Sequence, residues 1–152
     1  MRDKRFIAEH RGGLLSKKHH QQLMAWACAC TEHVFPLLGE TLDERLKNAL
    51  LIAKEWANGN TTVSEAMKAS VGAHAVAREL TNPTSIAVAR AVGQSIATAH
   101  MADHSLGLAI YALKAIINAV KSIETERKWQ NEQLPSEIKE IVLATRTIKE
   151  KA

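Results

Sequence analysis

The chain has 152 residues, of which 46% are hydrophobic and 24% are charged, and its formal net charge is +4. A chain of this length can bury a core without disulfides or a structural metal, and the composition is typical of a soluble globular protein. Acidic residues are mixed among the basic ones and only 4% of the chain is aromatic, so we expect no nucleic-acid partner. No apolar run approaches the ~18 residues that span a bilayer, which also argues against a membrane partner.

The N-terminus and the cysteines indicate a cytoplasmic protein. Residues 1–5 are mostly charged and no apolar segment typical of a secretory signal follows them. The two cysteines, Cys28 and Cys30, are two positions apart, so in a helix they point to different faces and do not readily form a disulfide or share a metal. We interpret them as reduced thiols in the core, which suits the cytoplasm.

Residues 1–15 are predicted to form an ordered N-terminal arm with a turn at Gly12-Gly13. Ser16 is a suitable N-cap for a first helix, which has apolar residues at helical spacing and ends near Pro36. The polar run Lys-Lys-His-His at 17–20 is interpreted as a solvated first turn of this helix.

Two capping boxes predict the next two helices. Thr41 and Glu44 have the spacing in which each side chain hydrogen-bonds the other's backbone at a helix start. Thr62 and Glu65 repeat the pattern and predict a third helix that runs to about residue 80.

A fourth helix is predicted to begin at Asn82-Pro83, with the asparagine as its cap and the proline in its first turn. Its apolar pattern continues beyond residue 120, but a helix of ~40 residues would be ~60 Å long, too long for a compact domain of this size. We therefore expect a break between residues 101 and 106, with Asp103 or Ser105 as the cap of the next helix.

The fifth helix is then expected to run to about Gln130, and a sixth to begin at Pro135-Ser136. No segment of useful length has the period of a strand. The sequence thus predicts an all-α fold: a single domain over residues 1–152, a compact bundle of five to six helices with an arm at 1–15 and a C-terminal helix at 134–152.

Polar residues of the types that form metal, catalytic or ligand-binding sites lie in two alanine-rich segments. His100, Asp103 and His104 are spaced so that one helix would place them on one face, and His74 and Arg78 are one turn apart on the third helix. One interpretation is a structural cluster in which these groups hydrogen-bond helix ends and Arg78 pairs with Asp103. A second is a pocket for a partner or ligand. A third is a metal or catalytic site made by His74, His100, Asp103 and His104, which a helix break at Asp103 would disrupt.

Three segments together resemble the Imm5-like family of bacterial immunity proteins: RFIAEHRGGL at 5–14, AHAVARE at 73–79 and ATAHMADH at 97–104. The resemblance extends over most of the chain. It implies a small cytosolic antidote, encoded beside a polymorphic toxin, that binds this toxin and neutralises it. It supplies no toxin-contact residues for this sequence.

We therefore expect a binding protein that is not an enzyme, has no cofactor and takes a cognate toxin as its partner. Such a function needs a rigid scaffold and a complementary surface patch, with charge accelerating encounter. The alternative is a small helical metal-binding protein or metal-dependent hydrolase that uses His74, His100, Asp103 and His104. A third alternative is a homo-oligomeric scaffold that binds no ligand.

Overall fold

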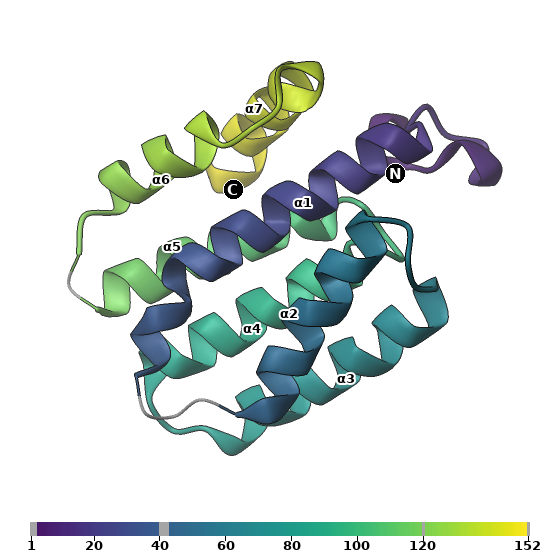
Figure 1. Ribbon diagram of the computed structural model, residues 1–152. Coiled ribbons are helices and arrows are strands. Elements are labelled where there is room, and N and C mark those ends of the chain that lie inside the picture. Colours follow the sequence, from purple (N-terminus) through teal and green to yellow (C-terminus); the bar gives the residue numbers. More distant parts are fainter. Residues whose placement is uncertain (1–2, 40–42, 120, 152) are drawn as a thin grey trace.

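The computed structural model describes residues 3–39, 43–119 and 121–151, and these residues are arranged as a layered set of helices (Figure 1). Seven α-helices lie in these ranges: α1 (Lys17–Val34), α2 (Glu44–Ala57), α3 (Val63–Glu79), α4 (Pro83–Ala97), α5 (His104–Asn118), α6 (Ile123–Glu132) and α7 (Ser136–Lys151). Three short 3-10 helices accompany them: η1 (Lys4–Phe6), η2 (Glu9–Arg11) and η3 (Phe35–Leu38). The all-α prediction is confirmed for this part of the chain.

The helix α4 lies at the centre of the arrangement. It packs most extensively against α3 and α5, and it also contacts α1 and α2 (Figure 1). The pair α6 and α7 lies to one side, next to α5 and α1. Every residue of α4 from Ala87 to Ala97 except Arg90 and Gln94 is buried, so these two polar residues are the accessible ones in this stretch of the helix.

Three of the predicted helix caps form the expected side-chain hydrogen bond. The side chains of Ser16, Thr62 and Asn82 each accept a hydrogen bond from the backbone N–H three residues ahead. Thr41 lies outside the described residues, but its assignment as a cap is wrong because α2 begins at Glu44 and its N-cap is Asp43, whose carboxylate accepts from the Arg45 N–H at 2.8 Å.

The number of helices exceeds the predicted five to six because the predicted fifth helix is two helices. α5 ends at Asn118, and the N–H of Lys121 turns back to the carbonyl of Ile116 at 3.0 Å. Ser122 then caps α6 by accepting from the N–H of Thr125. The break between the fourth and fifth helices was predicted at 101–106; α4 ends at Ala97 and α5 begins at His104, so it lies a few residues earlier.

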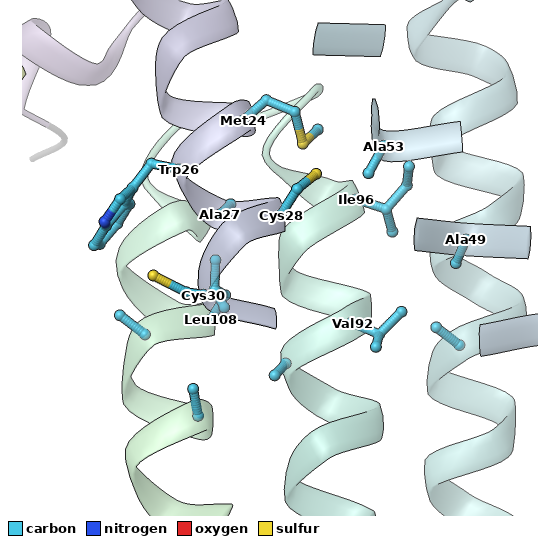
Figure 2. Packing of buried hydrophobic residues seen from close by; sticks show 14 of the residues in the cluster. Met24, Trp26, Ala27, Cys28, Cys30, Ala49, Ala53, Val92, Ile96 and Leu108 are labelled. Atoms are coloured by element: carbon cyan, nitrogen blue, oxygen red, sulfur yellow. The ribbon is translucent and has the colours of Figure 1, made fainter. Parts of the chain in front are cut away.

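Small side chains allow these helices to approach closely. Alanines of α1 and α2 interleave with larger residues such as Met24 and Ile96 (Figure 2). Cys28 and Cys30 are buried here as free thiols, as predicted. Burial raises the pKa of Cys28 to about 12 and also raises the pKa of Cys30.

A buried polar network holds α7 against α6 and α1. The guanidinium of Arg146, only 4% exposed, donates to Glu150 Oε1 at 2.6 Å, to Asn131 Oδ1 at 2.8 Å and to Gln130 Oε1 at 2.6 Å. The indole N–H of Trp26 donates to the Gln130 carbonyl at 2.8 Å. Because a buried charge is stable only with such partners, this network fixes how α6 and α7 lie on the other helices.

Residues 3–15 form a compact arm. Phe6 and Leu15 are buried, and Ala8 pairs with Leu15 in an isolated β-bridge. A Cβ atom on Gly13 would lie 1.9 Å from the carbonyl oxygen of Ile7, so the turn of the arm requires glycine at this position.

Candidate functional site

The predicted cluster of His100, Asp103 and His104 does not lie on one helix face. α4 ends at Ala97 and α5 begins at His104, so His100 lies in the linker between them. Asp103 occupies the N-cap position of α5, as predicted, but its backbone is in the right-handed helical region and its side chain does not make a cap hydrogen bond. The chain breaks within the cluster, as the predicted helix break implied, so the single helix face that the metal-site interpretation required does not form.

The structure divides the predicted residues between two sites. His74, Arg78 and His104 line an open pocket of about 410 Å³, which we call the α3–α5 groove. His100 lines a different pocket beneath the N-terminal arm. Asp103 belongs to neither lining. The full lining of the α3–α5 groove is Met67, Ser70, Val71, His74, Arg78, Arg90, Gln94, Ala97 and His104.

Two hydrogen bonds organise the polar row of the groove. Arg90 Nη1 donates to Nδ1 of His74 at 2.7 Å, so this ring nitrogen carries the lone pair. Burial, with the charges of Arg90 and Arg78 as smaller causes, lowers the pKa of His74 and favours the neutral imidazole. Nδ1 of His104 donates to Oε1 of Gln94, also at 2.7 Å.

Two glycines inside helices make room for these side chains. A Cβ on Gly93 of α4 would lie 2.5 Å from Cε1 of the His74 ring, and a Cβ on Gly107 of α5 would lie 2.7 Å from Oε1 of Gln94. Glycine inside a helix costs about 1 kcal/mol relative to alanine. Ser70 adds a hydrogen bond to the carbonyl of Gly93 at 3.2 Å. The polar row is therefore built into the helix packing.

The groove has positive charge and an apolar edge. The guanidinium groups of Arg78 and Arg90 line it, and none of its lining residues is acidic. Arg78 is exposed, and Val71 is 65% exposed on the same helix. Such a surface suits an anionic or acidic partner with some apolar area.

A second site lies beneath the N-terminal arm. One pocket of about 480 Å³ and a smaller one of about 50 Å³ adjoin there and share Ala8, His10, His20, Val63 and Ala99. We call them together the arm cavity. The remaining lining residues are Phe6, Ile7, Glu9, Arg11, Leu15, Lys17, Gln21, Trp56, Gly59, Thr61, Thr62, His100, Met101 and Ala102.

His20 is the central polar residue of the arm cavity. Its Nε2 donates to the carbonyl of Thr98 at 2.6 Å, and its ring centroid is 4.6 Å from that of Trp56. Burial lowers the pKa of His20, which keeps the ring neutral and leaves Nδ1 as an acceptor.

The interpretation of residues 17–20 as a solvated turn is therefore wrong for His20, which is 7% exposed. The signal was present in the sequence: His20 lies three residues before Leu23 and seven before Ala27, on the apolar face already predicted for the first helix. Arg90 and Gln94 were also missed, although with Gly93 they follow helical spacing.

The structure lends no support to the metal site. Within residues 3–39, 43–119 and 121–151, no group of three or more His, Cys, Asp or Glu side chains is arranged to hold a metal ion. In the same ranges, no helix has the length and apolar character needed to cross a bilayer.

These features define a helical protein with two preformed surface sites and no recognisable metal centre among its described residues. Its sequence matches the model of the family described as Imm-5 like putative immunity protein over residues 13–137. The chain belongs to this family, as the resemblance implied. Two of the three resembling segments lie within the match, and the first, at 5–14, lies almost wholly before it. Neither the curated proteins nor the solved structures contain a match to the chain.

Proposed function

We propose that this protein is an immunity-type binding protein that neutralises a cognate toxin by direct protein–protein contact. Membership of an immunity protein family carries the proposal. Neutralisation by binding needs no catalytic residue; it needs a folded surface that complements the toxin. We expect the encounter in the cytoplasm, where the free thiols Cys28 and Cys30 stay reduced.

We further propose the α3–α5 groove as the toxin-binding surface, with an acidic segment of the toxin as its occupant. Arg78 and Arg90 supply uncompensated positive charge in this lining, and Val71 supplies exposed apolar area beside it. The hydrogen bond from Arg90 to His74 holds one guanidinium in place before the partner arrives, which reduces the entropy cost of binding.

Co-expression with the product of the neighbouring gene tests the function. We expect that product to inhibit growth alone, and this protein to restore growth and to bind it in purified form. A neighbouring product that is harmless, or that this protein does not bind, would contradict the proposed function itself.

Two charge reversals test the surface. Arg78→Glu places a negative charge in the groove and should weaken toxin binding about 30-fold, since opposed like charges in an interface cost about 2 kcal/mol or more. Lys139→Glu makes the same change at an exposed position of α7 and serves as the matched control. Equal affinities of the two variants would exclude the groove and leave the immunity function standing.

A further inference from the structure

The larger pocket of the arm cavity has the size of a small-molecule site. Its walls come from four separate parts of the chain: the arm, the start of α1, the turn between α2 and α3, and the linker after α4. The larger pocket has about 480 Å³, and sites for small ligands usually measure about 300–1,000 Å³. The proposed toxin surface does not use this lining.

Part of the cavity lining is apolar and partly aromatic. Leu15, Trp56 and Val63 contribute apolar surface to the lining from three separate segments, and the first two are largely buried while Val63 is 39% exposed. An apolar lining of this kind binds a ring system by removing its surface from water.

Two residues that line the cavity, His20 and Gln21, have polar side-chain atoms with no hydrogen bond to the residues that the structure describes. Nδ1 of His20 forms no hydrogen bond within the described part of the chain, because the ring uses Nε2 for Thr98. The side-chain amide of Gln21 likewise has no hydrogen bond among the residues described. A neutral imidazole that is 7% exposed and retains an open acceptor is suited to an N–H or O–H donor of a ligand.

The charges at the cavity are mainly positive. Lys17 and Arg11 line it, and neither takes part in an ion pair between described residues. Glu9 is the one carboxylate of the lining. Lys17 and Glu9 are the charged residues that line the larger pocket, and Arg11 lines the smaller one. An anionic substituent is favoured on the Lys17 side, where the N-terminus of α1 also attracts negative charge.

We propose that the arm cavity binds a small aromatic anion that carries an N–H or O–H donor. Its ring system lies against Leu15 and Trp56, its donor bonds Nδ1 of His20, and its anionic group lies near Lys17. The inference does not depend on the toxin, and either proposal can fail without the other.

The dye 1-anilinonaphthalene-8-sulfonate has this chemistry, with aromatic rings, an N–H and a sulfonate. N-phenyl-1-naphthylamine has the same rings and N–H without the charge and is the matched neutral probe. We expect the sulfonate dye to bind the folded protein at one site per chain, with energy transfer from tryptophan that falls in Trp56→Phe. Binding of the two probes with equal affinity would overturn the anionic part of the proposal.

Four variants locate the site. Ala8→Phe and Val63→Phe fill the cavity from two walls and should weaken dye binding about tenfold or more. Lys17→Gln should weaken binding of the sulfonate dye about threefold, the size of one partly exposed ion pair, and leave the neutral probe unchanged. Arg78→Gln removes a cation from the α3–α5 groove and should change the affinity of neither probe.

Circular dichroism and thermal melting identify the variants that fold. If Ala8→Phe does not fold, Val63→Phe remains as the test, because Val63 is exposed enough to accept a larger side chain. Undiminished dye binding in a folded cavity-filling variant would overturn the proposal. The proposal would also be overturned if Arg78→Gln weakens dye binding as much as Lys17→Gln does.

Discussion

Replacing Gly93 with alanine tests whether the polar row of the α3–α5 groove is built into the helix packing. The added Cβ would lie 2.5, 2.6 and 2.9 Å from three atoms of the His74 ring. The ring would have to move away and give up its hydrogen bond from Arg90. Gly72 in α3 is the matched control, because a Cβ there would have no heavy atom within 4 Å beyond its own helix backbone and chain neighbours.

The expected free energies have opposite signs at the two glycines. Glycine to alanine in a helix interior stabilises by up to about 1 kcal/mol, so Gly72→Ala should raise the free energy of unfolding by about 0.5 to 1 kcal/mol. Gly93→Ala receives the same gain but loses about 1 kcal/mol with the hydrogen bond and about 1 to 2 kcal/mol through overpacking. The net expectation is a loss of about 1 to 2.5 kcal/mol.

A double-mutant cycle measured by urea unfolding isolates the cause. Removing the ring in His74→Ala removes the obstacle, so in this background Gly93→Ala should stabilise by about 0.5 to 1 kcal/mol, as Gly72→Ala does. The sign of the Gly93→Ala effect should thus reverse. If Gly93→Ala stabilises the otherwise unchanged protein, the close contact with the His74 ring does not constrain this helix pair and our account of the groove is wrong.

Four further predictions concern buried and paired groups. Arg146→Ala leaves three side-chain oxygens without their donor and should lower the free energy of unfolding by about 3 to 5 kcal/mol in urea titrations, whereas a loss below about 1 kcal/mol would contradict its role. Cys28 and Cys30 should react with Ellman's reagent only as fast as the protein opens, because burial raises both thiol pKa values; immediate labelling would contradict this. His20 has a folded pKa lowered by burial below its ordinary 6.5, so the unfolded chain binds more protons and acidification from pH 7.5 to 5.5 should lower Tm; in His20→Gln this contribution should vanish. Hydrogen bonds from α1 lower the pKa of Glu137 from 4.5 to about 2, so the stability it contributes is present above pH 4.5 and is lost as pH falls toward 2, which an NMR titration of its carboxyl group checks.

Local signals in the sequence predict the helix starts better than the helix ends. Ser16, Thr62 and Asn82 were identified as caps because capping depends on a side chain and a backbone N–H only three residues apart. The end of α5 was missed because the apolar pattern continues through it and no glycine marks it. Ser122 was the available signal, since it caps α6.

The sites were harder to predict than the fold because their walls come from distant segments. His74 and His104 were expected near one another and do line one groove, but their hydrogen-bond partners Arg90 and Gln94 become identifiable only when α4 lies between α3 and α5. The arm cavity needs the packing of four separate segments, for which single-sequence periodicity has no signal.

The choice of Arg78 and Lys17 for the binding tests follows from how the two sites are joined. The carbonyl of Thr98 accepts a hydrogen bond from His20 in the arm cavity. The hydroxyl of Thr98 donates to the carbonyl of Gln94, and the side chain of Gln94 lines the groove. A substitution of Thr98, the C-cap of α4, therefore disturbs both sites and does not assign an effect to either. Arg78 lines only the α3–α5 groove and Lys17 lines only the arm cavity. Two separate functions would be established if the Arg78 variant loses toxin binding but keeps dye binding, and the Lys17 variant loses dye binding but keeps toxin binding.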